Sequence, residues 1–391
     1  MNFPRQRFRG FQNPWNLWND DEVDRMKVNA AVLRTPGSPL TIESLELDVP
    51  EAGEVLVEVK AAGVCHSDLH PALGDWPVPT PIVLGHEGAG VVRAVGPGVT
   101  SVAPGDVVVF CWAPPCGACP PCQSGRPVLC DRLDRTAYRH RLPSGSARLR
   151  SGTDRVAAFL GTACFADFAV VAEAGAIRVP AGVPFDVLAT LGCAVVTGVG
   201  AVMNAAQVEP GSTVVVIGAG GVGLNVVQGA ALSHSGRIVA IDRQDAPLRL
   251  ARAFGATDVA LAPPSIVDAV RELTGGRGAD YVFDTVGSPS TVADAVAAAR
   301  KGGTIVVTGL ARIDGVASLA MFPFVMQEKR LIGSVYGSGR PSHDIPKLAE
   351  LYRAGKLKLR ELVTRTYPLR EINEALAALA RADGARGVIS W

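Results

Sequence analysis

The sequence has almost no net charge and few aromatic residues. Its 391 residues carry 38 Lys and Arg against 37 Asp and Glu, which gives a formal net charge of +1. A chain this close to neutrality has no field that would attract a nucleic acid or an anionic membrane, so we expect neither partner. Hydrophobic residues make up 48% and charged residues 19%, which is typical of a folded globular protein with room for two domains.

Long apolar runs and targeting signals are also lacking. No run is expected to reach the roughly 18 apolar residues that a membrane-spanning helix needs. The first 25 residues have no apolar core, contain four acidic residues and lack Ser, so they predict neither a secretory signal nor a transit peptide. We therefore expect a cytoplasmic protein in which residues 1–26 form an N-terminal extension. The pattern leaves open whether this extension is a docked arm, a disordered tail or the result of a start codon placed before Met26.

Cysteine is scarce and unevenly placed. Four of the eight cysteines lie in one short series, and two more are candidate ligands of a second site. This usage indicates metal binding in a reducing compartment and not a disulfide framework. The remaining two, Cys111 and Cys164, are expected to be buried, small apolar side chains.

Residues 63–90, GVCHSDLHPALGDWPVPTPIVLGHEGAG, concentrate metal-binding side chains. Thiolate sulfur and imidazole nitrogen are preferred ligands of zinc, and a catalytic zinc needs three protein ligands and one open position. Cys65 and His86 can supply two ligands, and Cys193, far along the chain, is the best candidate for the third. Asp68 can accept the second ring proton of a ligating His and fix its tautomer.

The short cysteine series has the spacing C-x2-C-x2-C-x7-C. It consists of Cys116, Cys119, Cys122 and Cys130. Four thiolates can close a tetrahedral shell with no open position, which indicates a structural zinc. An iron–sulfur cluster is the main alternative, but the fourth spacing and the lack of a second series in the sequence count against it.

From about residue 28 to residue 179 the apolar runs are short and separated by Gly and Pro, which predicts the strands of an antiparallel barrel or sandwich. The pattern changes at Pro210, where a buried-strand run leads into GAGGVG and then into an apolar helix. The following strand, RIVAID, ends in Asp242. This order is typical of a dinucleotide site, in which glycines admit the pyrophosphate and the carboxylate binds the ribose hydroxyls.

The candidate cofactor residues of this motif are Gly218, Gly220, Gly221, Val222, Gly223, Asp242 and Arg243. Asp242 would repel a 2′-phosphate and so favours NAD, although Arg243 beside it leaves NADP open. Further strands are predicted at TDVAL, DYVFDTVG, GTIVVTGL and RLIGSVYG, with helices at residues 246–254, 264–273 and 290–300. Such alternation predicts a doubly wound parallel sheet of six strands. Two more helices are expected at residues 344–354 and 369–381.

Through GHEGAG, the cysteine series and the glycine motif, the chain resembles the zinc-dependent alcohol dehydrogenases of the medium-chain dehydrogenase/reductase superfamily, from about residue 27 to residue 391. The resemblance implies a GroES-like β-barrel catalytic domain (27–194 and 338–391) with an inserted Rossmann NAD-binding domain (195–337). It also implies two zinc ions per chain and an active site in the cleft between the domains.

The resemblance assigns further roles. Glu87 would lie behind the zinc, and His70 would end a proton relay that starts at the Ser67 hydroxyl. His66 and Arg386 match contacts to the pyrophosphate, and Thr197 matches a residue near the nicotinamide. The positions that match the substrate pocket are Trp76, Trp112, Phe159 and Leu160. No companions suggest chemistry for the three other histidines, His140, His234 and His343.

Residues 131–155 form a polar connector with seven Arg and three Asp. The simpler interpretation is a solvated surface loop, and the alternative is that some of these Arg contact a carboxylate-bearing substrate. In the resembled family a connector of this length goes with dimeric members, so we expect a homodimer.

Together these features predict reversible oxidation of an alcohol to an aldehyde or ketone with NAD. Lewis acidity would lower the pKa of the alcohol, and Ser67 and His70 would carry its proton outward. Two Trp in the pocket favour primary alcohols with aromatic or medium-length apolar groups over ethanol. The alternative substrate is a thiol adduct of formaldehyde, such as S-(hydroxymethyl)glutathione or its mycothiol counterpart. A non-catalytic nucleotide-binding or redox-sensing protein is disfavoured, because this chain keeps the predicted zinc ligands and Ser67.

Overall fold

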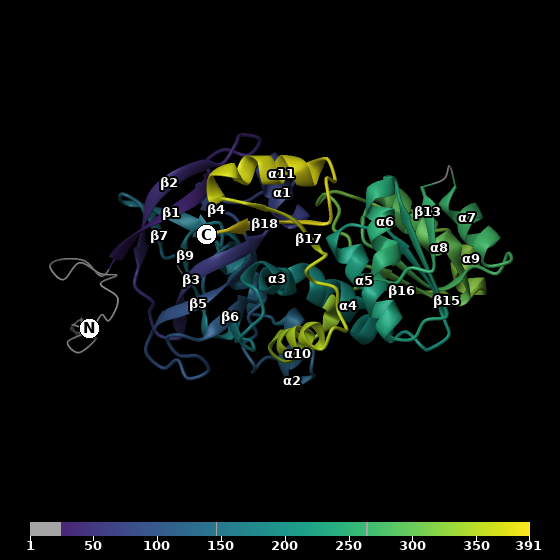
Figure 1. Cartoon of the computed structure of the whole chain (residues 1–391), viewed down its shortest axis with the longest axis horizontal. Helices are drawn as coiled ribbons and strands as arrows, with labels where there is room; N and C mark the ends of the chain where they lie inside the picture. The colour runs from purple at the N-terminus through teal and green to yellow at the C-terminus, as the bar shows by residue number, and fades with distance from the viewer. Residues whose placement is uncertain (1–24, 146, 263–264) are drawn as a thin grey trace.

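The computed structural model describes residues 25–145, 147–262 and 265–391. Two lobes lie along the long axis of the molecule, one built mainly from strands of the N-terminal half and the other a separate α/β unit (Figure 1). The predicted N-terminal extension falls almost entirely outside the described residues. Its last two residues, Arg25 and Met26, belong to the first strand.

A small closed barrel lies at the outer end of the N-terminal lobe. Its strand order is β1-β2-β7-β8-β4, and the neighbours are antiparallel except for β4 and β8. Along β1, Val28 and Ala30 are buried while Lys27 and Asn29 are exposed, because successive side chains of a strand point to opposite faces. The barrel strands are β1 (Arg25–Leu33), β2 (Thr41–Asp48), β4 (Ile82–Val83), β7 (Leu149–Ser151) and β8 (Asp154–Ala158).

A seven-stranded sheet completes this lobe, in the order β10-β6-β5-β3-β18-β17 with β9 also paired to β3. The C-terminal strand β18 pairs antiparallel with β3, so the end of the chain returns to the lobe in which it began, as the yellow elements of Figure 1 show. The strands are β3 (Glu54–Gly63), β5 (Glu87–Val95), β6 (Val107–Phe110), β9 (Phe168–Ala172), β10 (Ala176–Arg178), β17 (Val363–Tyr367) and β18 (Arg386–Ser390).

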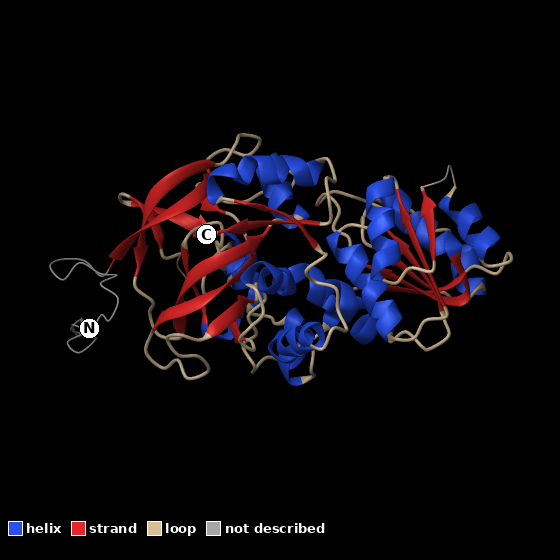
Figure 2. Cartoon of the chain, in the orientation of Figure 1, coloured by secondary structure: helices blue, strands red, loops and turns tan. Residues whose placement is uncertain are grey.

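The second lobe contains a six-stranded, all-parallel sheet in the order β13-β12-β11-β14-β15-β16. Helices flank both sides of this sheet (Figure 2). The central strand β11 is therefore buried from Val214 to Ile217, as its uninterrupted apolar run requires. The strands are β11 (Thr213–Ile217), β12 (Arg237–Asp242), β13 (Asp258–Leu261), β14 (Ala279–Asp284), β15 (Ala299–Val307) and β16 (Arg330–Gly333). The predicted combination of a GroES-like barrel and a doubly wound sheet is confirmed.

The helices follow the sequence signals closely. The predicted helix at 290–300 ends two residues early, because Ala299 pairs with Ala279 as the first residue of β15. Residues Leu369–Glu371 form a 3-10 turn ahead of the last helix. The helices are α1 (His66–Leu73), α2 (Pro120–Gln123), α3 (Phe185–Thr190), α4 (Val196–Gly200), α5 (Gly221–Leu232), α6 (Asp245–Phe254), α7 (Ile266–Leu273), α8 (Pro289–Ala298), α9 (Met321–Met326), α10 (Pro341–Arg353) and α11 (Ile372–Ala380).

One long helical segment, Phe185–Ala206, lies between the lobes and combines α3 and α4 with two π-helical turns at Leu191–Val195 and Ala201–Ala206. The segment has 22 residues and its most apolar 18-residue window has a mean hydropathy of 1.8, so by length and composition it could cross a membrane. The expectation that no run approaches that length is therefore wrong. The physical reason for its composition is burial, since 89% of the segment's apolar window is enclosed by the protein.

The polar connector of residues 131–155 is only partly the predicted surface loop. Its second half forms β7 and β8, which close the barrel. Arg148 is only 4% exposed and donates to Glu54 at 2.8 Å, and both Arg150 and Arg155 pair with Asp48. The solvated-loop interpretation is therefore wrong for the buried Arg148, while the partly exposed Arg150 and the exposed Arg155 pair with Asp48 of the barrel strand β2.

Candidate active site and metal centres

Four side chains from three distant parts of the chain meet at the inner end of the N-terminal lobe. The ligand atoms of Cys65, His86, Glu87 and Cys193 all lie within 4.8 Å of one another, and all four residues are buried. The thiol of Cys193 and then the charges of Arg386 and His86 lower the pKa of Cys65 well below its usual value. This environment favours the thiolate, which is the form that binds a metal.

His86 is oriented for metal binding by a buried carboxylate. Its Nδ1 lies 3.0 Å from Asp68 Oδ1, and the same carboxylate accepts the backbone N–H groups of Cys65 and Gly85 at 3.1 and 3.0 Å. Because a carboxylate only accepts, Asp68 holds a proton on Nδ1 of His86 and leaves Nε2 as the nitrogen that can bind a metal. That Nε2 is buried without a hydrogen-bond partner among the described residues. A bound cation would satisfy it.

A π-helical turn places Cys193 at the cluster. The turn spans Leu191–Val195, and such turns recur at functional sites because they widen a helix locally and redirect its side chains. The turn lies close against the ends of β5 and β6. A methyl group on Gly192 would come within 2.9 Å of Phe110 O and 3.4 Å of Glu87 Cα. Glycine at this position therefore permits the approach that brings Cys193 to Cys65 and His86.

Glu87 lies inside the cluster with its charge poorly satisfied. Burial raises its pKa to about 8, while the positive charge of Arg386 acts in the opposite direction. The two side chains are 3.2 Å apart and almost completely buried. Neither carboxylate oxygen of Glu87 has a hydrogen-bond partner among the described residues. A divalent cation held by the two thiolates and His86 would compensate this buried charge, so these donors fit a zinc ion.

The predicted relay residues lie on α1, directly after Cys65. Ser67 Oγ is 3.9 Å from Cys65 Sγ, which puts its hydroxyl at the edge of the cluster. His70 is one helical turn from His66, partly exposed, and its Nδ1 lies 3.2 Å from Asp75 Oδ2. The ring of Trp76 stacks on His70 with centroids 4.5 Å apart.

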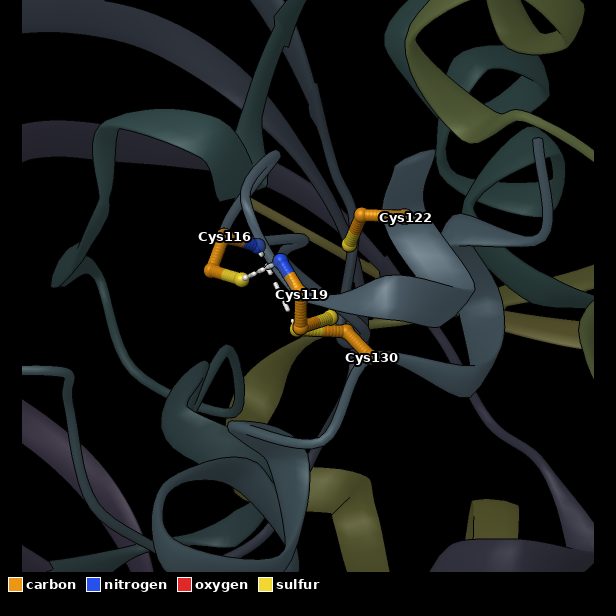
Figure 3. Close-up of side chains that lie close together, drawn as sticks. All are labelled: Cys116, Cys119, Cys122 and Cys130. Carbon is orange, nitrogen blue, oxygen red and sulfur yellow. Dashed lines mark hydrogen bonds between the residues drawn. The ribbon is translucent and has the colours of Figure 1, made fainter. Parts of the chain in front are cut away.

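The cysteine series forms a second group of ligands on a separate loop. The sulfur atoms of Cys116, Cys119, Cys122 and Cys130 lie within 4.8 Å of one another (Figure 3). No disulfide joins these four residues, all of which are free thiols. The backbone N–H groups of Ala118 and Cys119 lower the pKa of Cys116 to about 6. Four converging thiols with donor N–H groups around them fit a closed, tetrahedral zinc site.

The glycine motif forms the turn from β11 into α5. Gly218 has a φ of +91°, and a methyl group on Gly223 would lie 1.9 Å from Gly218 O, so both positions require glycine. At the end of β12, Asp242 accepts the Ala219 N–H at 2.7 Å and so lies beside the same turn. Arg243 next to it is exposed. The remaining motif residues, Gly220, Gly221 and Val222, form the cap and first turn of α5.

The other predicted cofactor residues surround the start of α5. Arg386 lies against it, since a methyl group on Gly221 would come within 3.0 Å of the guanidinium carbon. Arg386 also donates to Val64 O at 2.9 Å and faces Glu87, so it lies between the zinc cluster and the glycine turn. Thr197 lies on α4, which packs closely against α5, while His66 is exposed at the start of α1. The roles assigned to these residues stay predictions.

Aromatic side chains surround the cluster. Phe159 meets the edge of His86 with centroids 5.8 Å apart, and Trp112 packs on Tyr336 with centroids 4.6 Å apart. The indole N–H of Trp112 is buried without a partner among the described residues. Leu160, next to Phe159, has a φ of +50°. Trp76 stacks on the relay histidine, His70.

Sequence reasoning missed three residues near this site. His140, for which no companions were expected, stacks on Phe159 with centroids 5.4 Å apart and accepts the Leu160 N–H at 3.3 Å. Tyr336 donates to Gly192 O at 2.6 Å and so supports the π-helical turn from the other lobe. Tyr138 packs on Trp112. These contacts join residues far apart in the chain, so spacing carries no signal for them.

A cavity of about 590 Å³ opens beside these aromatic residues. Three exposed arginines of the connector line it, namely Arg135, Arg139 and Arg141, together with Pro77, Pro79, Asp134, Tyr138 and His140. Among the described residues none of the three guanidinium groups has an ion-pair partner, in contrast to the barrel arginines of the same connector. Cys111 and Cys164 lie outside both metal groups and are buried, as predicted, and burial raises the pKa of Cys111 to about 12.

Comparison with known proteins agrees with this geometry. The alcohol dehydrogenase GroES-like domain matches residues 51–181, and the zinc-binding dehydrogenase family matches residues 221–354. A protein of Amycolatopsis methanolica named NDMA-dependent alcohol dehydrogenase is 42% identical over 369 residues, which cover 93% of this chain and 99% of that protein. S-(hydroxymethyl)glutathione dehydrogenase of Paracoccus denitrificans is 35% identical over 379 residues, 94% of this chain and all of that protein.

Solved structures show the same relationship. Benzyl alcohol dehydrogenase of Acinetobacter calcoaceticus is 34% identical and superposes with a TM-score of 0.87 over 93% of this chain and 99% of that one. Acetophenone reductase of Geotrichum candidum, solved in complex with NAD, is 27% identical with a TM-score of 0.76 over 93% of this chain and 97% of that one.

The fold and the two groups of ligands thus define a zinc-dependent oxidoreductase. The chain belongs to the zinc-binding alcohol dehydrogenases of the medium-chain dehydrogenase/reductase superfamily, and it is a zinc-dependent alcohol dehydrogenase.

Proposed function

We propose that this enzyme reversibly oxidises primary alcohols with aromatic or medium-length apolar groups, with NAD as the acceptor. The observation that carries the proposal is the buried cluster of Cys65, His86 and Cys193, in which His86 Nε2 has no partner among the described residues and the His86 ring meets Phe159. Zinc in this cluster would supply the Lewis acidity that lowers the pKa of a substrate hydroxyl, and NAD would supply the hydride acceptor.

The chain's own residues would then handle the proton. Ser67, with its hydroxyl at the edge of the cluster, accepts the alcohol proton, and His70 on the same helix passes it to solvent. Asp68 holds His86 in the tautomer that a ligand needs. Glu87 and Arg386 lie behind the cluster and balance its charge.

The choice of NAD rests on Asp242. Its carboxylate lies at the carboxyl end of β12 beside the glycine turn, where it can accept the ribose hydroxyls and would repel a 2′-phosphate. Acetophenone reductase, a relative by fold and sequence, is described in complex with NAD, which supports this choice.

The preference for bulky apolar alcohols rests on the aromatic side chains. Phe159 is 1% exposed and meets the edge of His86, while Trp112 is 9% exposed and packs on Tyr336, whose hydroxyl donates to the turn that carries Cys193. Apolar side chains that bury a substrate gain about 0.8 kcal/mol per methylene, so a longer or aromatic alcohol should bind better than ethanol. The relative whose name includes benzyl alcohol agrees with this preference.

A thiol adduct of formaldehyde is the second candidate substrate. The cavity lined by Arg135, Arg139 and Arg141 favours it, because unpaired guanidinium groups bind the carboxylates that a glutathione or mycothiol-like carrier can present. The relative named S-(hydroxymethyl)glutathione dehydrogenase supports the same candidate.

NADH formation by the purified enzyme separates the two candidates. Benzyl alcohol, hexanol and ethanol are compared with formaldehyde, which is tested alone and with glutathione or mycothiol. Turnover of free alcohols, best with benzyl alcohol or hexanol, is the expected result. If only formaldehyde plus a thiol reacts, the apolar-alcohol proposal fails. A parallel assay with NDMA tests whether the co-reactant in the name of the Amycolatopsis relative also serves this enzyme.

We further propose that the enzyme is a homodimer formed through its second lobe. Eight large apolar side chains between residues 310 and 331 are exposed, from 43% for Leu331 to 80% for Val316. Four of them, Met321, Phe322, Val325 and Met326, belong to α9 and Leu331 belongs to β16. The other three lie in the segment before α9, between Leu310 and Val316. The outer edge of β16 has no strand partner among the described residues, and a second copy would cover both the edge and the apolar surface.

A further inference from the structure

Two contacts join the lobes next to the proton relay. Trp76 donates its indole N–H to the backbone oxygen of Ala311 at 3.2 Å, and Arg312 Nη1 lies 2.7 Å from Asp75 Oδ1. Asp75 and Trp76 follow α1 in the barrel lobe, whereas Ala311 and Arg312 follow β15 in the nucleotide lobe. These contacts therefore form or break when the two lobes change their relative position.

The same carboxylate also holds the relay histidine. Asp75 Oδ2 lies 3.2 Å from His70 Nδ1 while Oδ1 faces Arg312. Trp76 contributes a third contact, because its ring stacks on His70 at an interplanar angle of 20°. His70 is thus held on one edge by a carboxylate and on one face by an indole, and both groups are tied to the opposite lobe.

The carboxylate determines which nitrogen of His70 is available. An aspartate oxygen accepts and cannot donate, so it holds the proton of a neutral His70 on Nδ1 and leaves Nε2 free to accept a proton. The relay needs that nitrogen unprotonated when the alcohol proton arrives. Asp75 has the position of an orienting carboxylate for this base.

The contact across the lobes is weak enough to be reversible. The Arg312 side chain is 64% exposed and that of Asp75 is 23% exposed. An ion pair that is this exposed contributes little to stability, so a separation of the lobes can break it. The contact between Asp75 and His70 lies within one lobe, and the side chains are 23% and 19% exposed respectively. Both partners therefore stay together when the lobes move apart.

We propose that Asp75 is a positioning residue that orients His70. Its ion pair with Arg312, here called the clasp, couples closure of the cleft to the orientation of His70. The proposal rests on the proposed function only in taking His70 as the base that carries the proton out. In the closed arrangement Arg312 and Ala311 hold Asp75 and Trp76 in place, so His70 presents Nε2 in one orientation. When the lobes separate, Asp75 loses its cationic partner and Trp76 loses its acceptor.

Three single variants and one double variant test the clasp. Asp75→Asn keeps the size of the side chain, but its amide N–H can donate to His70 Nδ1 and so favour the tautomer with the proton on Nε2. Arg312→Ala removes the cross-lobe partner of Asp75. Asp314→Asn is the matched control, because Asp314 pairs with the same guanidinium at 3.3 Å from its own loop. The readouts are kcat and KM for the best alcohol, affinity for NADH, zinc content and melting temperature.

The expected pattern separates positioning from folding. Asp75→Asn lowers kcat by about tenfold or more, because a misoriented base forfeits part of the 10²- to 10⁴-fold contribution of general base catalysis. Arg312→Ala lowers kcat and weakens NADH binding by about fivefold at most, as loss of an exposed ion pair allows. Asp314→Asn behaves as the wild type. The double variant is no worse than Asp75→Asn, because both changes act through one carboxylate.

Several results overturn the proposal. A kcat of Asp75→Asn equal to that of the wild type shows that Asp75 does not position the base. Additive losses of kcat in the double variant show that Asp75 and Arg312 act separately. A fall in zinc content or melting temperature that matches the fall in kcat assigns Asp75 a structural role only. If the wild type oxidises no alcohol, the proposed function fails instead. The affinity for NADH then still tests the clasp, since Arg312→Ala must weaken NADH binding and Asp314→Asn must leave NADH binding unchanged.

Discussion

Asp68 is the residue on which the geometry of the candidate catalytic zinc site depends most. Its two oxygens accept hydrogen bonds from Cys65 N, Gly85 N and His86 Nδ1, so one carboxylate connects two of the three chain segments that supply ligands. It is completely buried, and each of these bonds is therefore made without competition from water.

We expect Asp68→Asn to weaken zinc binding at this site by about 10- to 100-fold, because the amide cannot accept from all three donors. Competition with a chelator, monitored by zinc content, measures the change. The four-cysteine site provides the internal control and should keep its ion. Loss of both ions in parallel, or unchanged affinity, would contradict the role assigned to Asp68.

His140 makes stability depend on pH. Burial lowers the pKa of His140 from 6.5 to about 4. Between these values the unfolded chain binds a proton that the folded protein does not, so stability falls as the pH decreases from about 6.5 toward 4. The loss reaches on the order of 3 kcal/mol. His140→Gln, which cannot be protonated, should lose less stability than the wild type between pH 7 and pH 5.

Melting temperatures of both proteins at the two pH values test this prediction. The two curves should converge or cross as the pH falls. A constant difference between them would show that His140 does not contribute to the pH dependence.

At the residue scale, the sequence predicted the metal ligands of the site better than the residues that pack around them. The ligand candidates were identified because Cys and His at these spacings are rare outside metal sites. Tyr336, His140 and Arg312 were not, because each acts through a contact with a residue far away in the chain. Arg312 and Asp75, for example, are 237 positions apart. Such pairs follow from how the lobes pack, and periodicity within one segment carries no information about them.

At the scale of elements, the π-helical turn at Leu191–Val195 is the least predictable feature of the site. The apolar pattern is equally compatible with a regular helix, since all five positions of Leu191–Val195 are buried. What selects the wider turn is its contact with β5, β6 and Tyr336, which lie elsewhere in the chain.

We expect Gly192→Ala to displace this turn. The new methyl group would lie 2.9 Å from Phe110 O, which is backbone and cannot move aside cheaply. Overpacking of this kind costs about 1 to 3 kcal/mol, and the shift should also lower zinc content by weakening the Cys193 ligand. Gly333→Ala is the matched control, because a methyl group there meets no atom within 4 Å. Melting temperature and zinc content are the measurements; equal behaviour of the two variants would contradict the prediction.

The polar connector of residues 131–155 shows a limit of prediction from charge composition. Its Arg-rich composition predicted a solvated loop, yet Arg148 is buried against Glu54. Charge density alone does not distinguish arginines that face water from arginines whose partners arrive from another strand. The β-strands of the nucleotide lobe were predicted well, because buried parallel strands have uninterrupted apolar runs bounded by turn residues.

At the scale of the whole molecule, the two-lobe architecture followed from the contrast between short interrupted runs and regular alternation of strands and helices. The domain boundaries and the cytoplasmic location stay predictions. The oligomeric state can be tested directly through the exposed apolar surface of the nucleotide lobe.

We expect Phe322→Asp to convert a dimer into a monomer. Phe322 is 79% exposed on α9, and a carboxylate there would be buried without a partner in the proposed interface. Leu261→Asp is the matched control, since Leu261 is 58% exposed but lies on β13, at the opposite edge of the same sheet. Light scattering after gel filtration measures the mass. A monomeric wild type, or equal masses for both variants, would contradict the interface.

The return of the C-terminal strand to the first lobe has a consequence for the order in which this enzyme becomes active during synthesis. β18 pairs with β3, and Arg386 lies between Glu87 and the start of α5 although it is 322 positions away from its acceptor Val64. The nucleotide lobe can fold as soon as its own strands have left the ribosome, because domains fold as units. The zinc cluster, by contrast, lacks the guanidinium of Arg386 and the pairing of β18 until the whole nucleotide lobe has been synthesised. A nascent chain should therefore acquire its dinucleotide fold before its catalytic competence.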